Sequence, residues 1–324
     1  MNSRERVTAV IRHEPPDRVP VYSWVWANLS GMITDAFGSL AAFEDAYEFD
    51  FAHLFGGPPA IAPETLSAAR AANGGTIDPA TACDIPYTDP DALNAYDDIR
   101  AQIQHHKNER ERFVYVQTPG IFEALNDAFG IENHLMYLMM YPEELKRVYQ
   151  KQADWNLRFA MNCLDLGVDM IHVSDDWGAQ HSLMFSLPTW REMIFPYHKI
   201  TAEAVKERGA FLSLHSDGNI NNVVDGVMEL GYDVVHPWQE SAGMSLDMFR
   251  EGCRDKFTVM GGLDVQNTIG FGNYDALEAS IRRVLGMFKD GGLLYCTTHF
   301  IQDHCSLDEL VFAYDLIHKL VREQ

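Results

Sequence analysis

Two side chains near the middle of the chain, His215 and Asp217, have the types and spacing that can bind a metal ion. Residues two apart on a strand project to the same side, so an imidazole and a carboxylate can reach one point. A third ligand, His299, would complete three protein ligands with an open fourth position, the arrangement of catalytic zinc. Cys296 is a reserve ligand, although burial as a thiol is the commoner fate of cysteine. In the alternative, structural interpretation, His215 forms a hydrogen bond with Asp217 or a neighbouring carboxylate. An isolated His-x-Asp motif has little specificity and taken alone favours this alternative.

Further polar side chains follow other predicted strands, where they could contact a substrate. Asp175 and Asp176 could act as a general base, support a ligand histidine or anchor a substrate. Because adjacent carboxylates repel each other, one of them tends to hold a proton unless a cation is close. In the alternative arrangement, one carboxylate points inward while the other caps the following helix. Gln180 and Gln239 are candidate substrate contacts near the same strand ends.

Aromatic side chains near the ends of the first two predicted strands offer an apolar wall. Trp24 and Trp26 are the main candidates, and such a wall would suit a ring-bearing substrate. Core packing accounts for at least half of these aromatic residues, which leaves both interpretations open.

The elements that must position these groups are short β-rich runs that alternate with amphipathic, helix-like segments. The eight predicted strands cover residues 19–24, 50–55, 113–117, 169–174, 210–215, 232–238, 257–261 and 292–297. The main predicted helices cover residues 142–166, 187–208, 220–230, 245–253, 274–289 and 306–322. This alternation predicts an α/β fold of the (β/α)8 TIM-barrel type, in which chemistry lies at the carboxyl ends of the strands. An open doubly wound sheet is the alternative, but no glycine-rich phosphate-binding motif follows any predicted strand.

The length is compatible with one domain over residues 1–324, because barrels of this type often exceed about 250 residues. Residues 56–112 are too many for an ordinary strand–helix unit and carry several glycine and proline turns. They predict an elaborated N-terminal segment with short helices over the barrel mouth.

The composition excludes several classes of protein. With 25 Lys and Arg against 47 Asp and Glu, the formal net charge is −22, which opposes nucleic acid or an anionic membrane as the main partner. No run approaches the roughly 18 apolar residues of a membrane-spanning helix, and the charged start lacks the apolar core of a secretory signal. Five scattered cysteines with no CxxC pair indicate reduced thiols. We therefore expect a cytoplasmic, globular protein that acts on a small molecule.

Several short motifs, spread in order over nearly the whole chain, resemble those of the uroporphyrinogen decarboxylase-like superfamily. They are Arg4-Glu5-Arg6, Arg12-His13-Glu14, Pro16-Asp17-Arg18-Val19-Pro20, Asp175-Asp176-Trp177-Gly178-x-Gln180, Trp190-Arg191-Glu192 with Pro196, His215-Ser216-Asp217-Gly218-Asn219-Ile220, Gly261-Gly262-Leu263-Asp264, Gly291-Gly292 and His299-x-Ile301-Gln302. Each motif is short, but the combination is specific. The resemblance implies a (β/α)8 barrel, which agrees with the strand count.

The resemblance implies one of two chemistries. True decarboxylases of this superfamily use an arginine-containing N-terminal segment to hold the carboxylates of the porphyrinogen, whereas residues 22–26 of this chain contain no arginine. The chain therefore resembles more closely the branch of zinc-dependent methyltransferases. These enzymes move a methyl group between a corrinoid protein and a thiol or another acceptor.

In that branch, a His-x-Cys motif and a later cysteine hold the zinc. Here His215 falls on the histidine, Asp217 on the first cysteine and His299 on the second, with Cys296 as the other match. A carboxylate and an imidazole in place of two thiolates make a harder, less electron-rich site. The leading hypothesis is a zinc-dependent methyltransferase that works with a small methylated substrate or a corrinoid protein and that could form a homodimer. The alternatives are a metal-free lyase that decarboxylates a carboxylate substrate and a binding protein without catalysis.

Overall fold

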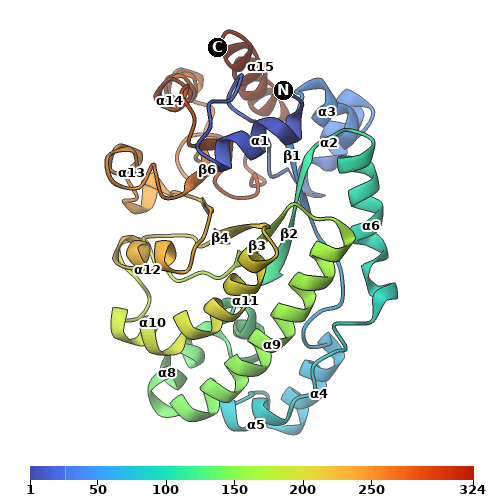
Figure 1. The fold of residues 1–324 in the computed structure, drawn as a ribbon, viewed down its shortest axis with the longest axis vertical. Coiled ribbons are helices and arrows are strands. Elements are labelled where there is room, and N and C mark those ends of the chain that lie inside the picture. The colour runs from blue at the N-terminus through green and yellow to red at the C-terminus, as the bar shows by residue number, and fades with distance from the viewer. Residues whose placement is uncertain (26) are drawn as a thin grey trace. The chain divides into compact units, whose positions relative to one another are not determined.

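The computed structural model describes residues 1–25 and 27–324, so Trp26, one of the predicted substrate contacts, lies outside the described residues. The protein has an α/β fold with a sheet of seven strands in the order β1-β2-β3-β4-β5-β6-β7, and helices connect the strands (Figure 1). The residues cluster into two compact units. We call them unit 1 (Met1–His53, His105–Val114 and Asp233–Gln324) and unit 2 (Leu54–Gln104 and Tyr115–Tyr232). The interpretation as one domain stays a prediction.

Unit 2 contains most of β2 (Phe113–Pro119), β3 (Met170–Ser174) and β4 (Phe211–His215), which pair in parallel. Pro119 pairs with Ser174, and Ser174 pairs with His215, so the three strands end level with one another. Every residue of β3 is buried, as expected for a parallel strand covered on both faces. The helical elements of unit 2 are α4 (Pro63–Ala72), α5 (Pro79–Asp84), η1 (Leu93–Tyr96), α6 (Asp97–Ile103), η3 (Glu123–Leu125), α7 (Asn126–Phe129), α8 (Ile131–Met140), α9 (Pro142–Leu166), α10 (Leu187–Met193), α11 (Phe195–Glu207), η4 (Asn221–Val223) and α12 (Val224–Glu229).

The longest of these helices, α9, has the bounds that the sequence predicts. Pro142 occupies its first turn, where a missing N–H leaves no bond unmade, and Gly167 ends it in the left-handed region at a φ of 100°. One face of α9 is buried against α11 and β3 (Figure 1). The predicted short helices of residues 56–112 are also present, as α4, α5 and α6.

Unit 1 contains β5 (Val234–His236), β6 (Thr258–Leu263) and β7 (Leu293–Thr297), with parallel pairing of β5 to β6 and of β6 to β7. Most of β1 (Phe51–Leu54) also belongs to it. Its helical elements are α1 (Ser3–Ile11), α2 (Ala27–Phe37), α3 (Leu40–Ala46), most of η2 (Gln104–Asn108), η5 (Glu240–Ala242), α13 (Leu246–Gly252), α14 (Tyr274–Met287) and α15 (Leu307–Arg322).

Seven of the eight predicted strands are confirmed, but residues 19–24 do not form the eighth. There, Val21 makes a single parallel bridge to Tyr295 of β7. Pro20 has no N–H to donate, and the N–H of Val21 donates instead to the Asp50 carboxylate at 2.8 Å. The Val21 N–H thus donates to a side chain instead of to the backbone carbonyl of a neighbouring strand. The fold is consistent with a TIM-like barrel, but over residues 1–25 and 27–324 the sheet is open and the predicted closed barrel is not formed.

Two expectations from composition can be compared with the structure. All five cysteines are free, as predicted. Among the described residues, no helix combines the length and the apolar character that crossing a membrane would require.

Candidate active site

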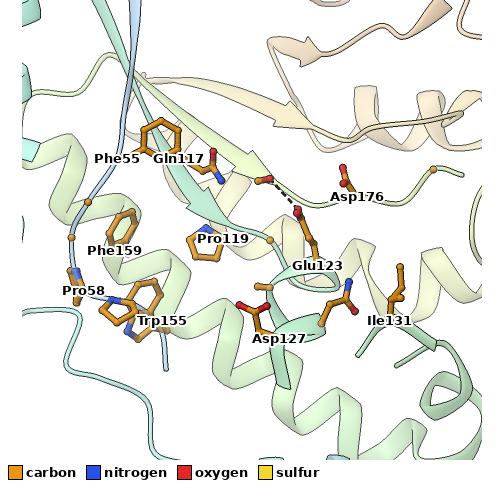
Figure 2. Close-up of a pocket in the computed structure, with 18 of the residues that line it drawn as sticks. Phe55, Pro58, Gln117, Pro119, Glu123, Asp127, Ile131, Trp155, Phe159 and Asp176 are labelled. Atoms are coloured by element: carbon orange, nitrogen blue, oxygen red, sulfur yellow. Dashed lines mark hydrogen bonds between the residues drawn. The ribbon is translucent and has the colours of Figure 1, made fainter. Parts of the chain in front are cut away.

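A cavity of about 760 Å³ opens at the carboxyl ends of β2 and β3 in unit 2. Its size lies within the range of small-molecule sites, roughly 300–1,000 Å³. Figure 2 shows the rings of Phe55, Trp155 and Phe159 on one side of this cavity and the carboxylates of Glu123 and Asp176 on the other. The apolar lining comprises Phe55, Pro58, Pro59, Pro119, Ile131, Trp155, Phe159 and Met184, and the acidic lining comprises Glu123, Asp127 and Asp176.

Glu123 begins the short helix η3, in the loop that follows the end of β2 at Pro119. Its Oε2 accepts a hydrogen bond of 3.0 Å from the hydroxyl of Ser174 at the end of β3. Burial, and then the nearby charge of Asp176, raises the pKa of Glu123 to about 7. This carboxyl group can therefore hold or release a proton near neutral pH.

Asp176 follows β3 and lines the same cavity, with its side chain 31% exposed. Its Oδ1 accepts a hydrogen bond of 2.7 Å from the backbone N–H of Asp217. Burial raises the pKa of Asp176, the imidazole of His215 opposes this shift, and the charge of Asp217 adds to it. Of the two predicted catalytic carboxylates, Asp176 is the one that lines the cavity.

Asp175 is fully buried, and its carboxylate binds three separate parts of unit 2. Oδ1 accepts the backbone N–H of Glu123 at 2.6 Å, and Oδ2 accepts the indole N–H of Trp177 at 2.9 Å. Oδ2 also lies 2.7 Å from Nε2 of His198, whose Nδ1 is 2.8 Å from the Tyr232 hydroxyl. Asp175 therefore holds the loop of Glu123, its own loop and α11 together. Its predicted role as a catalytic group stays a prediction.

The end of β4 brings together the two residues that the sequence predicts as metal ligands. His215 is 5% exposed, and its Nε2 lies 3.7 Å from Asp176 Oδ1 and 3.8 Å from Asp217 Oδ1. Both separations are too long for hydrogen bonds. Asp217 Oδ1 is buried and has no hydrogen-bond partner among the described residues. Ligands of a tetrahedral zinc ion lie about 3.4 Å apart, so His215 and Asp217 fit two positions of such an ion.

Two glycines allow the loops after β3 and β4 to pack backbone against backbone. A Cβ atom on Gly178 would lie only 2.6 Å from the backbone nitrogen of Asn219. Gly218 lies against the Gly178 backbone and has a φ of 77°, a conformation that favours glycine. The N–H of Asn219 donates to the carbonyl of Ala179 at 2.9 Å. This close approach keeps the acidic residues of the two loops next to each other.

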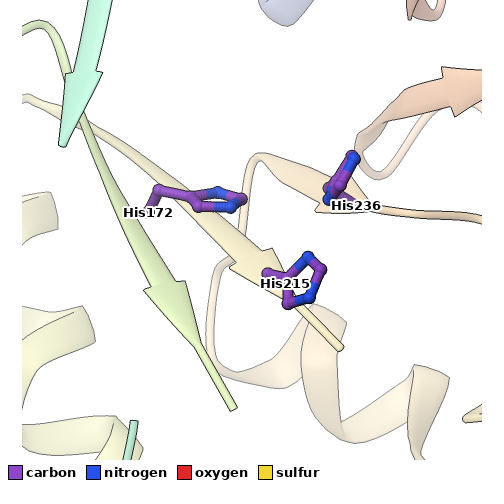
Figure 3. A group of neighbouring side chains, drawn as sticks. All are labelled: His172, His215 and His236. Carbon is purple, nitrogen blue, oxygen red and sulfur yellow. The ribbon is translucent and has the colours of Figure 1, made fainter. Parts of the chain in front are cut away.

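A second histidine of unit 2, His172, lies on β3, two residues before the strand end. Its Nδ1 is 2.8 Å from the Ser213 hydroxyl, and its ring centroid is 5.9 Å from that of His215. Figure 3 shows both rings on their neighbouring strands. His172 is fully buried and also contacts the ring of Tyr115. No motif of the sequence points to His172 as a site residue.

Unit 1 contains the predicted site residues Trp24, Gln239, Cys296 and His299. Trp24 is 2% exposed, and its ring stacks on His236 with centroids 4.2 Å apart and lies 6.3 Å from the ring of His299. Gln239 is buried directly after β5. The Cys296 thiol is fully buried and donates to the carbonyl of Thr297, and burial raises its pKa, which opposes metal-binding thiolate.

Unit 2 thus brings together Asp176, His215 and Asp217. Gln180 lies exposed in the loop after β3. His299 belongs to unit 1, so its role as the third metal ligand stays a prediction.

A further group of metal-ligating side chains in unit 1, Glu44, His105 and His106, already has cationic neighbours. Arg112 pairs with Glu44 and lies 3.2 Å from His106 Nδ1, and Arg110 lies 3.1 Å from His105 Nδ1. Two guanidinium groups repel a metal ion, so we do not regard this cluster as a metal site.

Sequence reasoning missed Glu123, His198 and the aromatic pair on α9. Glu123 could have been found, because it lies in the loop after the predicted strand 113–117, where barrel enzymes place catalytic groups. His198 is 23 residues from its partner Asp175 and lies inside a helix, so no local pattern links the two. Trp155 and Phe159 have helical spacing, which core packing explains equally well.

Comparisons with known proteins agree with this geometry. A model of the family Uroporphyrinogen decarboxylase (URO-D) matches residues 101–320. Among solved structures, a methyltransferase from Methanosarcina mazei is similar at 14% identity and a TM-score of 0.71, over 99% of each chain. A B12-independent methionine synthase from Shewanella sp. W3-18-1 is similar at 14% identity and a TM-score of 0.48, over 69% of this chain and 67% of that one. A search of curated proteins found no match.

At 14% identity the Methanosarcina mazei methyltransferase shows likeness of fold alone, and the family rests on the sequence match. That match confirms the resemblance drawn from the motifs and supports an enzyme. The chain belongs to the uroporphyrinogen decarboxylase family.

Proposed function

We propose that the protein is a metal-dependent methyltransferase that moves a methyl group between a small methylated substrate or a corrinoid protein and an acceptor. The observation that carries the proposal is the buried Asp217 Oδ1, which lacks a hydrogen-bond partner among the described residues and lies 3.8 Å from His215 Nε2. A buried carboxylate oxygen without a partner is costly unless a cation compensates it. The fold likeness to a methyltransferase supports the same proposal.

In this proposal, His215, Asp217 and His299 hold zinc. When bound, zinc supplies a Lewis acid that polarises the heteroatom of the donor or acceptor. Asp176 orients Asp217 by accepting its backbone N–H. Glu123, with its pKa near 7, takes up or releases the proton of an acceptor at the cavity wall. A corrinoid-carrying partner, a homodimer and a cytoplasmic location belong to the same proposal.

The alternative, a metal-free lyase acting on a carboxylate, is the weaker candidate. The acidic lining would repel an anionic substrate, and none of the described lining residues is a lysine, arginine or histidine. A substrate with several carboxylates would have no counter-ion in this cavity.

Metal analysis combined with a transfer assay tests the proposal. The purified protein should contain about one zinc per chain, and incubation with methylcobalamin and a panel of thiols should consume the methylated cobalt spectrum. His215→Ala should lose the zinc and slow transfer by more than about 100-fold, since outer partners of a metal site already cost 10–100-fold. His318→Ala, in helix α15 near the end of the sequence, is the matched control. This variant should keep both the zinc and the transfer activity. Absence of zinc together with undiminished transfer in His215→Ala would reject the mechanism.

A further inference from the structure

The cavity of unit 2 has an uneven distribution of charge. Its lining includes three carboxylates, those of Glu123, Asp127 and Asp176, and no cationic side chain among the described lining residues. The nearest cationic residues along α9 bind elsewhere. Lys151 donates to the carbonyls of Cys83 and Ile85 at 2.9 and 2.8 Å.

Arg158 of α9 likewise donates to both carboxylate oxygens of Asp91, at 2.9 and 2.8 Å. Lys151 and Arg158 thus hold the segment 83–91. Trp155 and Phe159 of the same helix line the cavity. An anionic ligand would meet repulsion there, and a cation would meet attraction at short range.

The wall opposite the carboxylates is aromatic (Figure 2). The rings of Trp155 and Phe159 are stacked, with centroids 5.2 Å apart and an interplanar angle of 15°. The indole N–H of Trp155 donates to the carbonyl of Thr88 at 3.2 Å, which fixes the orientation of the ring. Phe55 adds a third ring to the lining. Aromatic faces attract organic cations through their quadrupoles, and most strongly when the face is that of tryptophan.

Gly57 allows the chain to approach this wall closely. A Cβ atom at this position would lie 2.6 Å from Cε2 of Phe159, and its φ of 82° favours glycine. The prolines that follow, Pro58 and Pro59, are also lining residues and restrict the backbone next to the rings. The aromatic wall is therefore formed before a ligand arrives.

We infer that this cavity binds an organic cation, a methylated ammonium whose methyl groups contact the aromatic wall while its charge faces the carboxylates. This inference rests on the proposed function, because it names the small methylated substrate. In the transfer, the carbon–nitrogen bond breaks with its electron pair staying on nitrogen, which leaves a neutral amine. The electron pair of the acceptor, a thiolate or the reduced cobalt of a corrinoid protein, forms the new bond to the methyl carbon.

Binding measurements with matched probes test the inference on the purified full chain. Choline and 3,3-dimethyl-1-butanol have nearly the same shape, but only choline carries the positive charge. Titration calorimetry should show that choline binds at least about 10-fold more tightly than the neutral alcohol, which corresponds to the attraction of a desolvated cation to aromatic rings. Glycine betaine, which adds a carboxylate, should bind more weakly than choline. Equal binding of choline and the alcohol, or no binding of choline, would overturn the inference.

Variants locate the binding to this cavity. Glu123→Gln keeps the shape of the side chain. At pH 8, above the raised pKa of Glu123, it should weaken choline binding by about 10-fold without changing that of the alcohol. Trp155→Leu should remove most of the preference for choline, and circular dichroism must show that it is folded. Glu132→Gln removes one carboxylate from the exposed surface of α8 and is the matched control, which should bind choline as the parent does. Equal effects of Glu123→Gln and Glu132→Gln would place the cation outside the cavity and reject the inference.

The binding test does not require zinc or methyl transfer, so the two proposals can fail separately. Choline binding in a protein without zinc or transfer activity would reject the proposed function and leave the cation site. Zinc and transfer activity without any preference for choline would reject the cation site alone.

Discussion

Units 1 and 2 each contain a buried parallel strand that ends in a histidine, but the two histidines have different surroundings. In unit 2, His215 at the end of β4 lies within 3.8 Å of oxygens from Asp176 and Asp217. In unit 1, His236 at the end of β5 stacks on Trp24 at 4.2 Å, and its Nε2 is 3.2 Å from the carbonyl of Thr297. The same residue type at the same strand position is next to carboxylates in one unit and packs on a ring in the other. Neighbouring side chains, more than strand position, decide which histidine is available for metal chemistry.

The largest effect on stability should come from replacing Asp175. Its comparison with Asp176 distinguishes a structural carboxylate of unit 2 from one that lines the cavity. Asp175→Ala should lower the free energy of unfolding by about 3–5 kcal/mol, because it leaves His198 and two N–H donors buried without their shared acceptor. Urea unfolding of metal-free protein measures this change. Asp176→Ala is the matched control and should cost less than about 1 kcal/mol, since that side chain is 31% exposed. Equal costs would remove the distinction between the two residues.

An intermediate effect should come from Glu123, through the pH dependence of stability. The folded protein keeps the Glu123 proton up to about pH 7, whereas the unfolded chain releases it near the ordinary value of 4.5. Between these values the folded state holds more protons, so its stability falls as pH rises, by at most about 1.4 kcal/mol per pH unit. Urea unfolding of metal-free protein at pH 5 and pH 7 should show a steeper fall for the parent than for Glu123→Gln. Parallel pH profiles would mean that Glu123 titrates normally.

The smallest effect should come from Cys296. This residue tests whether side chains at the strand ends of unit 1 only pack in the core or also bind metal. Cys296→Ala should leave the zinc content unchanged and lower the free energy of unfolding by about 1 kcal/mol, the loss expected for one buried sulfur atom. Atomic absorption and urea unfolding measure the two quantities. Loss of zinc in this variant would make Cys296 a metal ligand.

Much of the fold could be predicted because parallel strands buried on both faces are continuous apolar runs. Residues 169–174 and 210–215 are such runs, and they form β3 and β4 with shifts of one residue. Residues 19–24 look equally apolar, but they do not form a strand. The difference depends on the bond between the Val21 N–H and Asp50, 29 residues away, which no local pattern reveals.

The candidate site could be predicted only in part. His215 and Asp217 are two residues apart, so their proximity follows from strand geometry, and the structure places them together. Glu123 and Asp176 come from different strand ends, and their interaction depends on the register of β2 and β3. The raised pKa of Glu123 is a property of this packing, which composition and spacing do not contain.

The contact between Gly178 and Gly218 shows which positions of the site tolerate substitution and which do not. Because the two backbones touch with no side chain between them, any larger residue at either position would push Asp176 away from Asp217. Larger side chains of the cavity wall, such as those of Ile131 and Met184, carry no such restriction because they line open space. New substrate preferences should therefore arise by exchange of wall residues such as Ile131 or Met184, while the pair of loops stays invariant in any engineered series.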